Sequence, residues 1–173
     1  MITSSKTITA FVVLLLCLLF SLQPAMAANN PLLKDFIGLW QTNGKAFGRP
    51  AHISLHFSDT LEGKFVRINY TIANLDEIEQ KVFFEGVAYY KQTGAATLSA
   101  FWADSSGDLH PITASRSENS LNVEWGIIGQ KQGKTKYELI SENELQVTDW
   151  ILKQGEWLQF SQNSLLRVSQ DPS

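Results

Sequence analysis

The sequence predicts an all-β protein: a single up-and-down antiparallel β-barrel of about ten strands, preceded by one short helix. Apolar and polar residues alternate along most of the chain after residue 38, which is typical of half-buried strands. Short turns separate these segments at even spacing, which favours a meander. An open sheet of this size would leave two long unpaired edges, so we expect it to close into a barrel.

The N-terminal 27 residues have the pattern of a cleaved signal peptide. A polar start with Lys6 precedes an apolar run over 8–20, and Ala25-Met-Ala27 forms a small-residue cleavage site. The alternative is a membrane anchor, but a spanning helix needs roughly 20 apolar residues and this run is shorter. We expect cleavage after Ala27 and a periplasmic or secreted protein, with no membrane span after the signal is removed.

The remaining chain has the size of one domain, which we place at 28–168, with a frayed tail at 169–173. Cys17 lies in the apolar run and leaves with the signal, so the mature chain has no thiol nucleophile or disulfide. The net charge of the whole chain is −3, and no basic stripe appears, which argues against nucleic acid as a partner.

The predicted helix covers 30–38. Asn30 is a favourable N-cap, Pro31 suits the first helical position, and Gly38 can end the helix. Its apolar residues recur at helical spacing and are Leu32, Leu33, Phe36 and Ile37.

The strands are predicted to follow one another without interruption. The first strand begins near Gly38. In the second, apolar residues on one face alternate with polar residues on the other, as Ile53 does with His52 and Ser54. The predicted ranges after the first are 51–58, 64–73, 81–91, 97–103, 109–116, 121–127, 134–140, 144–152 and 156–168. Glycine marks the tight reversals at 61–63, 92–94, 105–107, 132–133 and 154–155.

Gly38-Leu39-Trp40 after a short helix, together with Arg167 on the last strand, resembles the signature of lipocalins. The whole mature chain is therefore similar to the calycin superfamily, which includes lipocalin-like and nitrobindin-like barrels, and it also resembles bacterial lipocalin-like domains of unknown function. The resemblance implies that Arg167 covers the Trp40 indole and closes one end of the barrel. Nitrobindin-like proteins bind haem through a late histidine, but no histidine follows His110 here. We therefore expect no cofactor.

These features favour a protein that binds a small apolar or amphipathic ligand inside the barrel or at its mouth. The candidate ligand-binding residues are Arg67, Tyr70, Glu85, Tyr89, Trp102, His110, Arg116 and Trp125. An inward Arg67 or Arg116 would hold an acidic group of the ligand. The same charges would form ordinary surface pairs if they pointed outward, and the periodicity alone leaves both orientations open.

His110 is the residue best suited to catalysis, because Asp104, Asp108 and Glu85 are candidate carboxylate partners for it. The alternative is a loop histidine that only satisfies its turn. His52 and His56 share one strand face, but Ser54 between them is a poor metal ligand, so we expect no metal site.

Three functional hypotheses remain in order of preference. The first is the small-molecule binder, and the second is an interaction or assembly module whose barrel is solid. The third is an enzyme that uses His110 with Asp104 or Glu85, a hypothesis that depends mainly on analogy with other barrels of this kind.

Overall fold

The computed structural model describes residues 30–75 and 81–168, and the predicted signal peptide and C-terminal tail lie outside these ranges. Within them the chain forms one 3-10 helix and ten strands. The elements are η1 (Pro31–Phe36), β1 (Gly38–Ala46), β2 (Arg49–Thr60), β3 (Phe65–Asn74), β4 (Val82–Gln92), β5 (Thr97–Asp104), β6 (Leu109–Ser117), β7 (Ser120–Gly126), β8 (Gln132–Ser141), β9 (Glu144–Lys153) and β10 (Glu156–Arg167).

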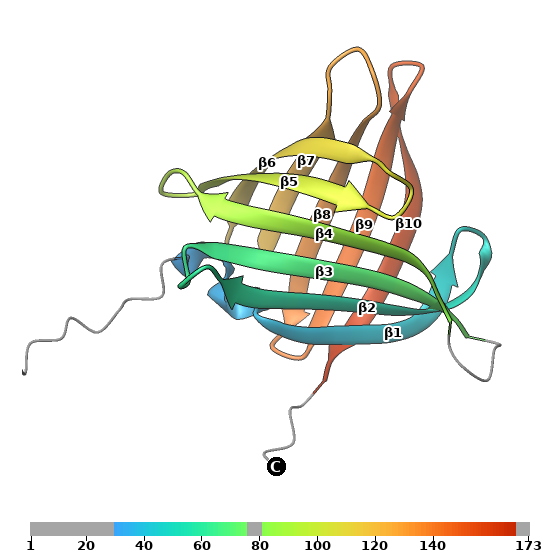
Figure 1. Cartoon of the computed structure of the whole chain (residues 1–173), viewed down its shortest axis with the longest axis horizontal. Helices are drawn as coiled ribbons and strands as arrows, with labels where there is room; N and C mark the ends of the chain where they lie inside the picture. The colour runs from blue at the N-terminus through green and yellow to red at the C-terminus, as the bar shows by residue number, and fades with distance from the viewer. Residues whose placement is uncertain (1–29, 76–80, 169–173) are drawn as a thin grey trace, which may run out of the picture.

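Each strand pairs antiparallel with the next one in the sequence, and β10 pairs with β1 to close the barrel. This arrangement confirms the predicted all-β, closed antiparallel barrel. The closing contact is short, because the paired residues are only Trp40 with Arg167 and Gln41 with Leu166. β1 to β4 run across the front of Figure 1, and β8 to β10 cross behind them steeply. The strands of the front wall and of the back wall therefore run in different directions.

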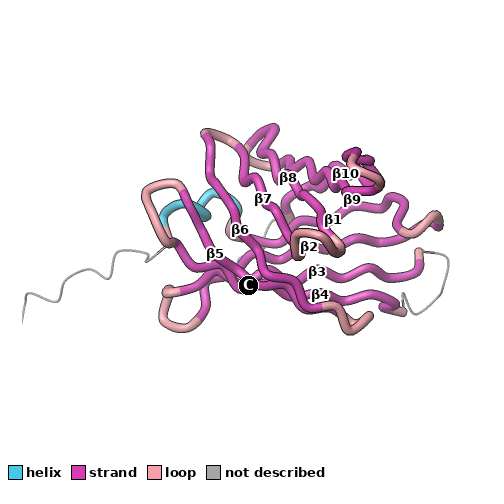
Figure 2. The backbone as a smooth tube through the Cα atoms, turned by 90° about the horizontal axis from the view of Figure 1, so that it is seen from above, coloured by secondary structure: helices cyan, strands magenta, loops and turns pink. Residues whose placement is uncertain are grey.

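The segment predicted as an N-terminal helix is the 3-10 helix η1, with Pro31 in its first turn. Asn30 does not cap it with its side chain. Its amide Nδ2 instead donates a hydrogen bond to the carbonyl oxygen of Tyr90, 3.4 Å away on β4. Leu33 and Phe36 are fully buried and insert η1 into one end of the barrel, where it lies in Figures 1 and 2.

Arg167 joins η1, β1 and β10 at this closed end. Its guanidinium carbon lies 4.0 Å from the centre of the Trp40 ring, and its Nη2 donates to the carbonyl of Asp35 at 2.8 Å. Gly38 allows this approach, since a Cβ there would lie 2.7 Å from Nη1 of Arg167. Gly38 also has a φ of +133°, which favours glycine over any residue with a side chain.

The apolar core is densest next to η1. The inward residues Phe57, Val66 and Leu121 have no exposed surface there, and the Trp40 indole donates to the Phe36 carbonyl at 2.8 Å. Burying such side chains stabilises the fold by roughly 1.5–3 kcal/mol each.

In the described residues no helix is long and apolar enough to cross a membrane.

Candidate functional site

Away from η1, the part of the inner wall that β5 to β9 form keeps some contact with solvent. Strand register identifies the inward residues, because they alternate with outward ones and pair with one another across the strands. Inward residues of β2 and β3 are buried away from η1 as well, as Ala51, Ile53 and Ile72 are, whereas Trp102, Trp125, Asp149 and Ile151 on β5 to β9 remain partly exposed. We call the space that this accessible part of the inner wall faces the lumen. Solvent reaches these inward residues from this end of the barrel, which we call the mouth.

Two tryptophans line the lumen, and each lies over a glycine of a neighbouring strand. A Cβ at Gly86 would be 2.0 Å from Trp102, and one at Gly133 would be 1.9 Å from Trp125. The Tyr70 ring also lies near Trp102, with ring centroids 6.3 Å apart. The glycines therefore supply the space in which these aromatic rings form a wall.

Asp149 is the polar centre of the lumen. It lies on β9 between Thr135 of β8 and Ser161 of β10, with which it is paired in register. The Thr135 hydroxyl donates to Asp149 Oδ1 at 2.7 Å. The Trp125 indole donates in turn to the Thr135 hydroxyl at 3.3 Å. A short chain of hydrogen bonds thus connects the aromatic wall to the carboxylate.

Burial raises the pKa of Asp149 to about 6, and hydrogen bonds from Thr135 and Ser161 only partly oppose this shift. The carboxylate also raises the pKa of the hydroxyls of Tyr70 and Tyr137, in both cases after the larger effect of burial. Asp149 nonetheless keeps some accessible surface. Asp149 is therefore largely desolvated but still keeps some contact with solvent.

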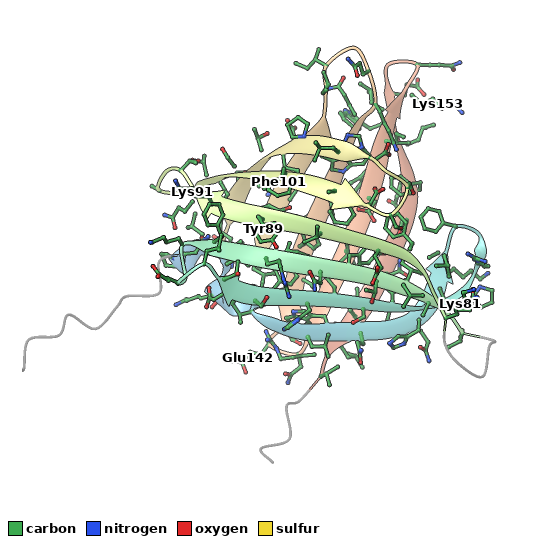
Figure 3. All side chains as sticks on the ribbon, in the orientation of Figure 1. Lys81, Tyr89, Lys91, Phe101, Glu142 and Lys153 are labelled. Carbon is green, nitrogen blue, oxygen red and sulfur yellow. The ribbon has the colours of Figure 1, made fainter. Side chains whose placement is uncertain are left out.

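The structure divides the predicted ligand-binding residues into two groups. Tyr70, Trp102, His110 and Trp125 occur in the inward series and lie around the lumen. Arg67, Glu85 and Tyr89 lie between inward residues on β3 and β4 and therefore face outward. Tyr89 stacks on Phe101 of β5, with centroids 5.5 Å apart, and Figure 3 shows both on the outside of the front wall.

Arg116 points inward, but it lies at the closed end and its donors are used there. Its Nε donates to the Leu32 carbonyl at 3.1 Å, and its Nη1 donates to the Ser117 and Ser120 carbonyls. Its Nη2 lies 3.4 Å from a carboxylate oxygen of Asp35. Arg116 thus holds η1 in place and does not reach the lumen as a free cation.

His110 lies at the mouth, with its ring stacked on Trp125 at a centroid distance of 5.3 Å. Its carboxylate neighbour is Asp108, whose Oδ2 is 3.5 Å from His110 Nε2. Asp108 also accepts a hydrogen bond from Lys131, and this contact is the main reason why its pKa is lowered. Of the three carboxylates that the sequence offered as partners, the structure thus brings Asp108 to His110 and not Asp104 or Glu85.

Asp104 has a different role from the expected partnership with His110. Its Oδ2 accepts the Trp102 indole N–H at 2.9 Å, and its Oδ1 accepts the backbone N–H of Ser106 at 2.9 Å. The carboxylate therefore orients one lumen tryptophan and closes the turn between β5 and β6. Glu85, the other proposed partner, lies on the outer face, where its backbone N–H donates to the Ser105 hydroxyl at 3.1 Å.

The outer surface carries two depressions on the opposite side of the strands from the lumen. One crosses β3, β4 and β5, has a volume of about 370 Å³, and includes Asn69, Thr71 and Glu85. The other crosses β7 to β10, has a volume of about 320 Å³, and includes Trp150 and Trp157. In the second, Lys134 lies 4.4 Å from the centre of the Trp157 ring. Both are open grooves without a buried charge among the residues that line them.

The two histidines of β2, His52 and His56, face outward. His52 Nδ1 is 2.8 Å from Asn43 Oδ1 on β1, within hydrogen-bonding distance. Over residues 30–75 and 81–168 no group of three or more histidine, cysteine or acidic side chains has an arrangement that could hold a metal ion.

Sequence reasoning missed Asp149 and Thr135. The signal was present in 144–152, where Leu145, Val147 and Ile151 follow one another at intervals that include position 149. A carboxylate within an apolar, period-two series is an inward carboxylate.

Comparison of the chain with family models and with curated proteins finds no match.

Proposed function

We propose that this protein binds a small apolar or amphipathic molecule in the lumen. The observation that carries the proposal is the position of Asp149, which is deep in the barrel, accessible to solvent and bonded to Thr135 at 2.7 Å. A solid barrel would place an apolar residue there, because an enclosed carboxylate without a cation is costly. An aromatic wall with a few polar groups is typical of ligand pockets.

The aromatic residues of the wall support this assignment. Trp102, Trp125 and Tyr70 would contact an apolar chain or ring, and Asp104 and Thr135 hold the two indoles by their N–H groups. Indoles fixed in this way lose little freedom on binding, which favours affinity.

A fluorescence titration tests the proposal. The purified protein is titrated with the neutral, apolar dye N-phenyl-1-naphthylamine, and we expect saturable binding of one dye per chain. Trp102→Ala and Trp125→Ala should each weaken binding about tenfold, since each removes part of the wall. The matched control is Trp157→Ala, which removes a tryptophan from the outer groove and should leave the affinity unchanged.

Two results would contradict the lumen as the site. One is the absence of saturation. The other is a loss of affinity in Trp157→Ala as large as that in Trp102→Ala, which would assign the dye to the outer groove across β7 to β10.

We further propose that the barrel is of the calycin type and that the protein is exported. The cation–π contact between Arg167 and Trp40 supports the first part. The order of residues over 1–27 supports the second. N-terminal sequencing of the protein from the periplasm of a bacterial host tests export, with Ala28 expected as the first residue. Retention of Met1 would overturn it.

A further inference from the structure

The charge inside the lumen has the opposite sign from the one that Arg67 or Arg116 would provide. Arg67 faces outward, and Arg116 is engaged with η1 at the closed end. Asp149 is the charged residue on the middle of the inner wall in the part of the chain that the structure describes, and it has no ion-pair partner there. We propose that the lumen selects ligands with a cationic head group, such as a protonated amine, and binds that group at Asp149. This inference rests on the proposed lumen site.

The surroundings of Asp149 are suited to an organic cation. The Thr135 hydroxyl occupies Oδ1, and a carboxylate has further acceptor positions open to a donor from the ligand. Aromatic residues face the same space, and Tyr70 and Tyr137 are close enough for Asp149 to affect the pKa of both. Aromatic ring faces attract ammonium groups, more strongly where water is excluded.

The desolvation of the unpaired Asp149 carboxylate is what makes the preference for a cationic head group strong. Asp149 is poorly solvated in the empty protein, so a cation that reaches it replaces missing water contacts as well as adding attraction. A neutral head group offers less, and an anionic head group would be repelled. The protein therefore discriminates between head groups at the inner wall, while the aromatic residues contribute affinity for any apolar tail.

The other titratable groups near this position do not cancel the charge. Tyr70 and Tyr137 are neutral at ordinary pH, because burial raises the pKa of both. His110 faces the lumen from β6 but lies at the mouth, where Asp108 is 3.5 Å from its Nε2. Asp104, also at the mouth, adds a second negative group that favours the entry of a cation.

Three ligands that differ only in the head group test the inference. Octylamine, octanol and octanoate share one tail, and at about pH 8 they carry a positive, zero and negative charge respectively. Each is used to displace N-phenyl-1-naphthylamine from the full protein. We expect octylamine to compete about tenfold more strongly than octanol, and octanoate to be the weakest.

The variants assign this preference to one carboxylate. Asp149→Asn should bring octylamine and octanol within about twofold of each other while keeping the octanol affinity. Glu124→Gln removes an outward carboxylate and should keep the full preference. A measurement on the unmodified protein at about pH 5, where Asp149 is largely protonated, should reproduce the loss without a substitution.

The outcomes separate this inference from the proposed function. If octanoate or octanol competes as well as octylamine while the dye still binds, the head-group selection is wrong and the lumen site stands. If the preference persists in Asp149→Asn, the cation binds elsewhere and the inference fails. If neither the dye nor any of the three ligands binds, both the inference and the proposed function are wrong.

Discussion

The indole of Trp125 lies so close over Gly133 of the neighbouring strand that a single added carbon at Gly133 would come within 1.9 Å of the ring. The two residues are directly paired between β7 and β8. One bulky and one absent side chain thus share one position on the lumen wall. Trp102 comes equally close to Gly86, but these two residues are diagonal to each other on β5 and β4, since Gly86 is paired with Asp104.

Gly133→Ala should displace the Trp125 ring and lower the free energy of unfolding by about 1–3 kcal/mol, because the added methyl overpacks the wall. Chemical denaturation at equilibrium measures the loss. The matched control is the same substitution in a Trp125→Leu background, where the smaller side chain leaves room and the cost should be much smaller. Equal costs in both backgrounds would contradict the steric explanation.

Arg167→Lys should destabilise the closed end by about 2 kcal/mol, since lysine replaces neither the planar contact with Trp40 nor the three donors that reach the carbonyls of Asp35, Ile37 and Glu142. Arg49→Lys is the control, because Arg49 makes a cation–π contact with Phe83 at the other end without joining elements of the closed end. Thermal unfolding should separate the two variants, and similar shifts in both would show that the closed end has no special role.

Asp149→Asn should change how stability depends on pH. The pKa of Asp149 in the folded protein is about 6 against an ordinary value of 3.8, so the native state binds more protons than the unfolded state between these values. Stability of the unmodified protein therefore falls as pH rises from about 4 to about 6. Asn should add about 1–2 kcal/mol at about pH 8 and nothing below about pH 4, after allowance for solvent screening.

Denaturation of both proteins across this range tests the sign of the effect. A gain that is present at low pH as well would show that packing around position 149 causes it, and a loss at pH 8 would show that the carboxylate has a cation partner in the native state.

Arg67→Gln should leave the affinity for the neutral dye within about twofold of the original value, since Arg67 alternates with the inward residues Val66 and Ile68 and faces outward. The measurement is the same fluorescence titration. A large loss of affinity in this variant would place the ligand on the outer face of β3 and β4.

Most of the fold follows from local patterns that the sequence shows directly. The period-two alternation in 51–58 and 121–127 predicts strands because half-buried sheets require it, and β2 and β7 lie there. Gly133 shows where such reasoning fails. The sequence predicted a turn at 132–133, but Gly133 lies within β8 and the turn comes earlier, at 127–131. Its missing side chain serves a tertiary contact with Trp125, which no local pattern reveals.

The site was less predictable than the fold. Trp102 and Trp125 were candidate ligand-binding residues, but the sequence left open whether the aromatic residues only pack the core or also line a cavity. The arginines were not separable from sequence, since Arg67 and Arg116 differ only in which side of a strand they occupy. Asp149 was overlooked because its significance comes from the absence of a cation on the facing strands, which depends on how all the strands are arranged around the barrel.

The short contact between β1 and β10 has a consequence for the order in which the protein folds. Every other strand pair joins neighbours in the sequence and can form by local zipping, but this pair joins the two ends of the domain through Trp40 with Arg167 and Gln41 with Leu166. Closing so long a loop costs entropy that two residue pairs repay only when the sheet already exists. Until the last strand has arrived, β1 is an exposed edge that a second chain can pair with. The protein is therefore most prone to aggregate during folding, in the interval before β1 and β10 pair.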